Sequence, residues 1–199
     1  DVVNSMNKKT DGVYFTDRSI VAFLVSAALE GYQDRSAEAL FGLRIIDPAM
    51  GAGFFLTEMV DQLSGLIAAK SELAPAEIRR RVLCGCIYGI DKNPVAVDIA
   101  MFTLWLTELQ GDEAFPELRS RLLAADSLLL VPPDRETEEN RDLMGWSQLF
   151  PEVFGGTGPE QGFDIVIGNP PWGKIKTNVN SFLLNDAGTL AALPQGQAK

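Results

Sequence analysis

The sequence predicts an α/β fold in which a mainly parallel, doubly wound sheet carries helices on both faces. Three observations support this prediction. Short apolar segments rich in β-branched residues alternate along the chain with longer segments of helical length. A glycine-containing turn follows the first of the short segments. Acidic or amide side chains stand where the short segments end, and open parallel sheets bind their ligands at that edge.

The composition limits the kinds of protein that this chain can be. With 199 residues, 46% of them hydrophobic, it is large enough for one domain with a substantial core. No apolar run could span a bilayer and no signal peptide is visible, so we expect a cytoplasmic protein without a membrane partner. The net charge of −10 argues against a surface that grips DNA phosphates by itself. Either a DNA-binding part lies elsewhere, or the protein does not bind DNA.

Cysteine and histidine usage predicts no metal site. The chain has no histidine, and Cys84 and Cys86 are its two cysteines. A strand is expected over residues 86–91, and the two cysteines are too close in the chain to bridge comfortably across it. Reduced thiols are the expected state.

The first predicted helix covers residues 17–30, after a polar, patternless stretch over residues 1–11 that we expect to be disordered or truncated. Thr16 is a suitable N-cap and Gly31 a suitable C-terminal stop. The first strand, residues 43–47, then ends in Asp47.

The turn after Asp47 is the first candidate binding site. Gly51 and Gly53 let a ligand approach the backbone, and a helix predicted over residues 54–70 points its positive N-terminus there. The turn lacks the full Gly-x-Gly-x-x-Gly pattern, so a nicotinamide or flavin is weakly supported. An acid at the strand end suits a positively charged ligand better than a pyrophosphate. The alternative is a tight strand–helix turn in another domain of similar fold.

Two further strands end in acids. After a helical segment over residues 71–81, the second strand ends in Asp91, whose carboxylate could accept both hydrogen bonds of a ribose diol. A turn or capping role for Asp91 is the alternative. The helix over residues 95–110 is apolar nearly all round, so we expect it to be deeply buried. The third strand, residues 121–126, ends in Asp126.

The last apolar run, residues 163–167, predicts a buried strand that stops where two prolines forbid further ladder bonds. The stiff backbone beyond it presents the Asn169 amide, the Pro170 carbonyl and the Trp172 ring together. The amide and carbonyl oxygens can accept hydrogen bonds from an amine, and the ring can stack on a flat heterocycle. The alternative is an ordinary strand followed by a Pro-Pro turn with the tryptophan packed beneath it.

The segment Asn169-Pro170-Pro171-Trp172 resembles the Asn-Pro-Pro-Tyr/Trp catalytic motif of amino-methyltransferases. Residues 146–154 and 162–164 are similar to the lead-in of adenine-specific DNA methyltransferases from restriction–modification systems. The resemblance covers most of residues 12–176 and implies a Rossmann-like fold that binds S-adenosyl-L-methionine. The family's sheet has more strands than we count here, and its recognition domain follows the catalytic one. We therefore expect a catalytic domain over residues 12–176, truncated after the catalytic strand, whose open edge is covered by a neighbour or by residues after Trp172. Residues 177–199 would be a tail or the start of a further segment.

The resemblance implies a role for each motif. It gives Tyr14 and Thr16 to the methionine moiety of the cofactor, Asp91 to its ribose and Asp126 to its adenine amino group. The family more often has Cys and Ser where Met50 and Ala52 stand. The implied catalytic residues are Asn169, Pro170, Pro171 and Trp172. The implied cofactor-binding residues are Tyr14, Thr16, Asp47, Pro48, Ala49, Gly51, Gly53, Phe54, Asp91, Asp126 and Asn169.

The implied activity is transfer of a methyl group from S-adenosyl-L-methionine to the exocyclic amino group of adenine in DNA. The implied partners are duplex DNA, with the target adenine flipped out and held through a recognition domain, and a specificity or restriction subunit. Two alternatives stay open. One is a methyltransferase for another amine, such as a protein glutamine or an RNA base. The other is a non-catalytic, cofactor-binding scaffold within a larger complex.

Overall fold

The computed structural model describes residues 16–107, 118–130, 145–155 and 161–170. Within them, parallel pairings join four strands into one sheet of order β3-β2-β1-β4. The strands are β1 (Ile45–Asp47), β2 (Ile87–Asp91), β3 (Leu122–Ala124) and β4 (Ile165–Val166). The predicted α/β class with a parallel sheet is confirmed.

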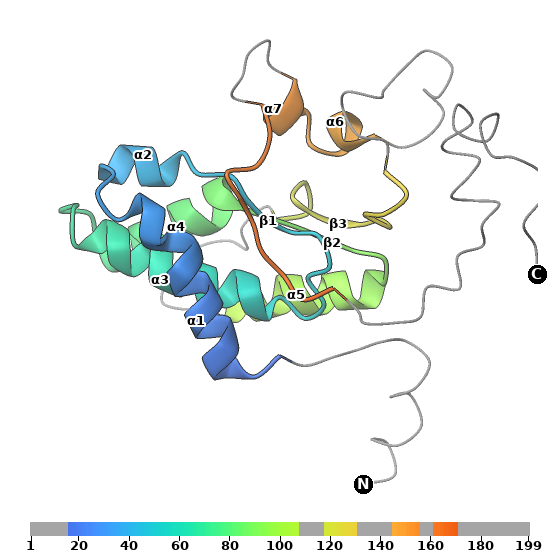
Figure 1. Cartoon of the computed structure of the whole chain (residues 1–199), viewed down its shortest axis with the longest axis horizontal. Helices are drawn as coiled ribbons and strands as arrows, with labels where there is room; N and C mark the ends of the chain where they lie inside the picture. Colours follow the sequence, from blue (N-terminus) through green and yellow to red (C-terminus); the bar gives the residue numbers. More distant parts are fainter. Residues whose placement is uncertain (1–15, 108–117, 131–144, 156–160, 171–199) are drawn as a thin grey trace, which may run out of the picture.

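The helices cover both faces of this sheet (Figure 1). Those on one side are α1 (Arg18–Leu29), α3 (Phe54–Ala68), α4 (Pro75–Cys86) and α5 (Pro94–Leu106). Those on the other side are the short α6 (Trp146–Leu149) and α7 (Pro151–Phe154). The 3₁₀ turn η1 (Glu30–Tyr32) and α2 (Ala37–Phe41) lead from α1 into β1. No helix of the described residues is long and apolar enough to cross a membrane.

The order of the strands creates a switch point. From β1 the chain moves outward through β2 to β3, and it then returns to place β4 on the opposite side of β1. In sheets of this kind, ligands bind beside the carboxyl ends of the two strands where the direction reverses. In the described part of the chain β4 is an edge strand, as predicted, with Val166 66% exposed. The predicted cover after Trp172 lies outside the described residues.

Two apolar clusters stabilise the sheet. The larger one joins the strands to α1, α3, α4 and α5. The smaller one is rich in aromatic rings, and its edge-to-face contacts include Tyr88–Phe150 at 5.4 Å and Tyr88–Phe163 at 5.2 Å between ring centroids. Trp146 and Phe154 pack against the same cluster. The segment 146–154, which resembles the family lead-in, is therefore a packing element that supports the strand before Asn169.

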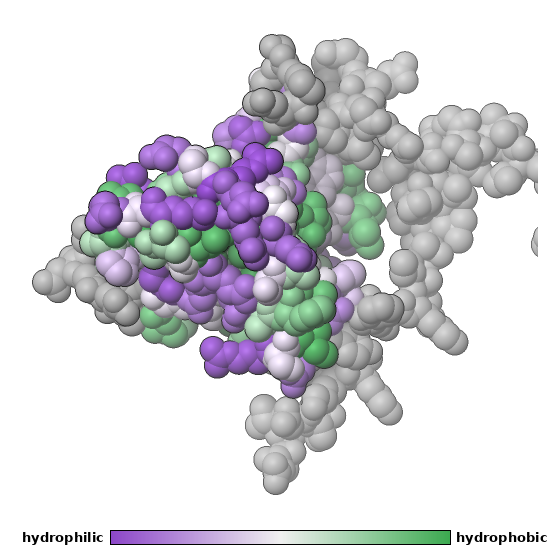
Figure 2. Space-filling view, turned by 60° about the vertical axis from the view of Figure 1, so that its left-hand side comes forward, coloured by the Kyte–Doolittle hydropathy of each residue, from purple (hydrophilic) through white to green (hydrophobic). Residues whose placement is uncertain are grey.

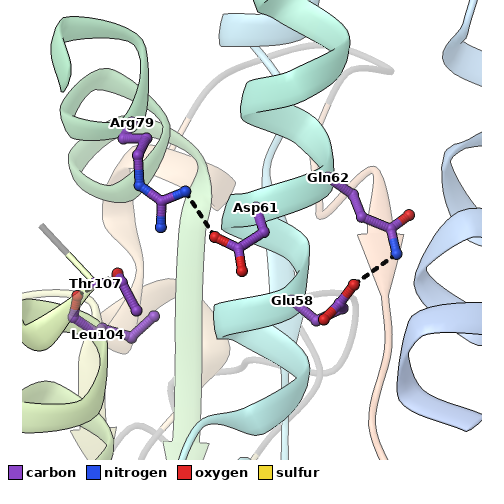
Figure 3. A network of polar contacts seen from close by, with 6 residues as sticks. All are labelled: Glu58, Asp61, Gln62, Arg79, Leu104 and Thr107. Atoms are coloured by element: carbon purple, nitrogen blue, oxygen red, sulfur yellow. Dashed lines mark hydrogen bonds and ion pairs between the residues drawn. The ribbon is translucent and has the colours of Figure 1, made fainter. Parts of the chain in front are cut away.

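Polar contacts tie α3 to the helices beside it. Arg79 on α4 places its Nη1 2.6 Å from Asp61 Oδ1 (Figure 3). Gln62 Nε2 donates to Glu58 Oε1 at 2.8 Å and to the carbonyl of Ala22 in α1 at 2.9 Å. A partly exposed ion pair is worth about 0–1 kcal/mol, so apolar packing supplies most of the stability. The polar contacts fix how α1 and α4 lie along α3.

The predicted start of α1 is wrong by one residue. The N-cap is Asp17, whose side chain accepts a hydrogen bond from Ser19 N at 2.8 Å. Aspartate and threonine are both good caps, so the local sequence does not choose between them. The predicted stop at Gly31 is also wrong, because the chain continues through it as η1.

Helix α5 is not deeply buried, contrary to the prediction. Its inner face is buried at Val97, Ala100, Met101 and Leu104. Its outer residues Val95, Ile99, Phe102 and Leu106 are 46 to 61% exposed. A helix that packs on one face of a sheet is covered on one side only, whatever its composition. Exposed hydrophobic side chains also lie on α1, at Ile20, Phe23 and Leu24. Figure 2 shows hydrophobic groups at the surface among hydrophilic ones.

The predicted position of Cys86 at the start of a strand is wrong, and both cysteines are helical. Both lie in the last turn of α4, because this helix runs to Cys86 and β2 begins directly afterwards at Ile87. Cys86 is fully buried and its Sγ donates to the carbonyl of Phe41 at 3.3 Å. Burial raises the pKa of this thiol to about 12, so it is a protonated core residue.

Candidate functional site

The carboxyl ends of β1 and β4 meet at the switch point. The two strands pair in the register Ile45↔Ile165 and Ile46↔Val166, which brings Ile167 level with Asp47. Ile167 N continues the ladder by donating to the carbonyl of Ile46 at 2.9 Å. Asn169 follows two residues later. The fold therefore brings the acid at the end of β1 and the amide after β4 to the same edge of the sheet.

The carboxylate of Asp47 lies directly against the backbone of Gly168. A Cβ atom at position 168 would overlap Asp47 Oδ1, so only glycine fits there without movement. Asp47 is 1% exposed, and its Oδ1 accepts a hydrogen bond from Ala49 N at 3.0 Å. Asp47 thus contacts both the turn after β1, through Ala49, and the end of β4, through Gly168. Its contact with a ligand stays a prediction.

Burial also changes the titration of Asp47. Loss of solvent raises its pKa to about 7, the hydrogen bond from Ala49 N opposes this rise, and the negative charge of Asp91 adds to it. A cation bound nearby would favour the ionised form. A carboxyl group that titrates near neutral pH at a strand end is typical of functional sites, although structural acids can show the same shift.

We expect Asp47→Asn to remove a pH-dependent loss of stability. The ordinary pKa is 3.8 and the folded value about 7, so the folded protein retains a proton that the unfolded chain releases. This contribution to stability is fully present below about pH 4 and is lost as the pH rises through about 7. Denaturant unfolding should show the variant gaining on the wild type, by on the order of 3 kcal/mol, between about pH 4.5 and pH 7.5.

The matched control for this measurement is Asp98→Asn, which changes an exposed aspartate on α5. It should show no comparable gain. A difference between Asp47→Asn and the wild type that stays constant over this range would contradict a raised pKa for Asp47.

The turn between β1 and α3 depends on two glycines. Gly51 and Gly53 have φ values of +53° and +81°, in the left-handed region that favours glycine. Gly53 is also the N-cap of α3, and a Cβ there would lie 3.2 Å from the Cβ of Ala100 on α5. Gly51 N donates to Asp91 Oδ2 at 2.9 Å. This hydrogen bond ties the turn to the end of β2, and α3 begins at the same edge of the sheet.

Met50 faces the core and not the edge of the sheet. It is 4% exposed, its N donates to the carbonyl of Ile90 at 3.0 Å, and its Sδ occupies the space where a Cβ of Gly89 would lie. The departure from the family's usual cysteine thus affects packing beneath the turn. Pro48, Ala49 and Ala52 are half-buried, while Phe54 is 49% exposed at the start of α3.

The two other predicted acids end neighbouring strands. Asp91 accepts hydrogen bonds from Gly51 N through Oδ2 and from Asn93 N through Oδ1, the latter at 2.8 Å. The turn role that the sequence left open is therefore present, and the ribose contact stays a prediction. Ala125 N donates to the carbonyl of Asp91 at 3.1 Å, which brings Asp126 to the same edge. Asp126 Oδ1 accepts from Leu128 N at 3.2 Å.

The amide of Asn169 is half-buried and contacts the start of α1. Its Nδ2 donates to Thr16 Oγ1 at 3.0 Å. The next residue, Pro170, is exposed. Tyr14, Pro171 and Trp172 lie outside the described residues.

Comparison with known proteins gives the family. Residues 85–192, more than half of the chain, match the model of the Eco57I restriction-modification methylase family. The chain belongs to this family. It is 25% identical over 172 residues to the type II restriction enzyme and methyltransferase RM.Eco57I of Escherichia coli, covering 74% of this chain and 16% of that protein.

A second relative comes from Methanocaldococcus jannaschii. It is the putative type II restriction enzyme and methyltransferase RM.MjaORFECS2P, 26% identical over 109 residues, which are 52% of this chain and 9% of that protein. The chain thus spans less than a fifth of the length of either relative. The family match includes Asp91 and the Asn-Pro-Pro-Trp segment, whereas the turn with Gly51 and Gly53 lies before it.

Sequence reasoning missed two features of this Eco57I-family site. The first is Gly168, and a signal existed, since a glycine directly after a buried strand often marks close approach of another group. The second is the contact between Thr16 and Asn169. No local pattern could reveal it, because the two residues are 153 positions apart in the chain.

Proposed function

We propose that this chain is the catalytic domain of a restriction–modification methyltransferase that methylates the exocyclic amino group of adenine in DNA. One observation carries the proposal: the switch point joins the glycine turn after Asp47 to the strand end that carries Asn169. Direct methyl transfer needs donor and acceptor atoms about 3–3.5 Å apart, in line. The cofactor turn lies on one side of the switch point and the amine-binding motif on the other. This placement supports an in-line approach of the donor and acceptor atoms.

The residues at the ends of β1 and β2 fit S-adenosyl-L-methionine, which supplies an activated methyl group on a positively charged sulfur. No described atom lies within 4 Å of a Cβ built on Gly51, so the turn is open there. Asp91 beside it is half-buried and can accept hydrogen bonds from the ribose diol. Asp126 stands at the same edge, and a bound cation would favour the ionised form of Asp47 there. These acids suit a cationic cofactor better than a pyrophosphate.

Asn169 and Pro170 act on the amine that is methylated. The amide oxygen of Asn169 and the Pro170 carbonyl accept the two hydrogen bonds of an amino group. In free adenine the lone pair of this nitrogen is delocalised into the ring. The two hydrogen bonds would localise it on the nitrogen and make that atom the nucleophile. The chain has no histidine, and none is needed, because the proton can leave after positive charge has built up on the nitrogen.

Trp172 provides the stacking surface for a flipped base. Flipping costs a few kcal/mol, and stacking on an aromatic ring returns about 1–3 kcal/mol. The net charge of −10 leaves phosphate binding to another part of the protein or to a specificity subunit. The named relatives are restriction enzymes and methyltransferases, which supports a place for this chain in a cytoplasmic restriction–modification system.

The test is product analysis with the complete natural protein. Unmethylated duplex DNA is incubated with cofactor labelled in its methyl group, and the digested nucleosides are separated by mass spectrometry. We expect the label on the exocyclic nitrogen of adenine. Label on cytosine would overturn the choice of base. Label on protein or RNA and never on DNA would overturn the proposed substrate and favour a methyltransferase for another amine.

We expect Asp91→Ala to weaken binding of S-adenosyl-L-methionine by about 1.5–3 kcal/mol, the range for hydrogen bonds to a charged group. The loss includes the bond that Gly51 N donates to Asp91 Oδ2. Calorimetric titration of the folded variant measures it. Asp98→Ala removes the same charge from the exposed side of α5 and should bind as the wild type does. Equal affinity in both variants would remove Asp91 from the site.

A further inference from the structure

The hydroxyl of Thr16 is available to Asn169 because α1 begins one residue later. Asp17 caps α1 with its own carboxylate, so the Thr16 side chain has no capping role in the helix. The Nδ2 group of Asn169 donates to Thr16 Oγ1 at 3.0 Å, and both residues are partly shielded from solvent. The contact joins the start of the described chain to the amide at its end.

The position of Thr16 is fixed by the helix that follows it. Val21, Val25 and Leu29 bury one face of α1 in the main core. Gln62 on α3 donates to the carbonyl of Ala22, and α3 itself starts at the glycine turn. At the far end of α1, Tyr32 Oη donates to the carbonyl of Asp164, next to β4, at 3.2 Å. Thr16 is thus placed relative to both the turn and β4.

In the structure, the Nδ2 end of the Asn169 amide makes this contact. The Thr16 hydroxyl can also donate, so the contact anchors the amide and does not by itself choose the end. The two ends of an amide are almost equal in size but opposite in function, since the oxygen accepts hydrogen bonds and the nitrogen donates them. The torsion that exchanges them is broad and roughly two-fold. With Nδ2 directed at Thr16, Oδ1 is the end that faces away from α1. A target amine needs an acceptor there, because its own hydrogens must be bound.

We propose that Thr16 is a positioning residue that anchors the Asn169 amide beside the amine to be methylated. The catalytic effect of this contact rests on the proposed function. The contact between Thr16 and Asn169 itself is a property of the chain alone. The positioning role also differs from the role in cofactor binding that the family resemblance gives to Thr16. A positioning role lowers the rate of transfer and leaves cofactor affinity unchanged.

The test compares Thr16→Val and Thr16→Ser in the complete protein. Valine keeps the shape and removes the hydroxyl, whereas serine keeps the hydroxyl. We expect Thr16→Val to lower the single-turnover rate roughly tenfold, since the lost bond is of ordinary strength. Its KM for cofactor should stay unchanged, and Thr16→Ser should restore most of the rate. The control is Thr103→Val on α5, which removes a hydroxyl that donates to the carbonyl of Ile99 at 2.8 Å. It should leave the rate unchanged.

Each outcome decides the proposal. A normal rate in Thr16→Val would overturn it, and so would a raised cofactor KM with a normal rate, which would assign Thr16 to the cofactor. In the Asn169→Ala background, Thr16→Val should have no further effect on the rate. An additional loss there would show that Thr16 acts through another group.

A second readout does not depend on methylation. The side-chain amide of Asn169 gives a pair of proton resonances in a ¹⁵N correlation spectrum, and comparison with Asn169→Ala assigns them. We expect Thr16→Val to shift this pair and to speed exchange of its protons with water, and Thr103→Val to leave it unchanged. An unshifted pair in Thr16→Val would overturn the positioning role. A wild type that transfers no methyl group would instead overturn the proposed function, and the spectrum would still test the contact between Thr16 and Asn169.

Discussion

Asn169→Ala is expected to lose about 10²–10³ in the rate of methyl transfer, which is typical for removal of a preorganised polar contact at a reacting centre. The amide bonds to Thr16 on one side and is proposed to meet the target amine on the other. Single-turnover transfer to DNA, measured with labelled cofactor in the complete protein, gives the rate.

The family resemblance also places Asn169 among the cofactor-binding residues, but cofactor affinity should be unchanged in the same variant, because the amide is proposed to act on the amine only. Calorimetric titration measures this affinity, and thermal unfolding checks that the variant is folded. A variant that transfers methyl groups at the wild-type rate would remove Asn169 from the chemistry. One that fails because it no longer binds the cofactor would move Asn169 to the cofactor side of the site.

Gly168→Ala is expected to damage both stability and activity. The added Cβ would overlap Asp47 Oδ1, which is buried and bonded to Ala49 N, so either the carboxylate or the strand end must move. Overpacking of this kind costs about 1–3 kcal/mol. The shift falls on the residue before Asn169, and a displacement of about 1 Å in a reacting group can cost roughly 10²-fold in rate.

The cause of this damage can be isolated by a double variant. If the overlap with Asp47 is responsible, Gly168→Ala should cost much less stability in an Asp47→Ala background, as a double-mutant cycle would show. Gly65→Ala is the control, because no described atom lies within 4 Å of a Cβ at that position of α3. Equal costs in both backgrounds would contradict a direct conflict with Asp47.

The arrangement of strands and turns was predictable because its signals are local. β-branched runs that end in Asp47, Asp91 and Ile167 mark the strands, and glycine or proline follows each of them within a few residues. Since the carboxyl ends of parallel strands share one edge, the acids and the Asn169 segment were expected together. The structure places Asp47, Asp91 and Asn169 at this edge, and their roles toward a ligand stay predictions.

The ends of helices and strands were less predictable where neighbouring residues suit the boundary equally well. Thr16 and Asp17 are both good caps, and the helix begins at the second of them. The segment Cys84–Ile87 has no proline, and its one glycine, Gly85, lies inside the last turn of α4. Nothing local therefore shows that α4 runs on to Cys86 and that β2 begins directly afterwards. The exposed face of α5 was missed for a different reason. An all-apolar helix shows that it can be buried, not which side the rest of the protein covers.

The contacts that refine the site could not be predicted, because they join distant parts of the chain. Asp47 against Gly168, and Thr16 against Asn169, each link a residue near the start to one beside β4. They depend on the exact placement of β4 next to β1 and of α1 on α3. The raised pKa of Asp47 follows from the same packing, since burial is its main cause.

The central claim is that the switch point between β1 and β4 joins a cofactor turn to a catalytic amide. The most direct measurement is a crystal structure of the complete protein with S-adenosylhomocysteine, the unreactive product of the cofactor. We expect its ribose hydroxyls on the carboxylate of Asp91, its chain beside Gly51 and Gly53, and its sulfur directed toward Asn169. A ligand bound away from Asp91, or with its sulfur directed away from Asn169, would contradict the claim.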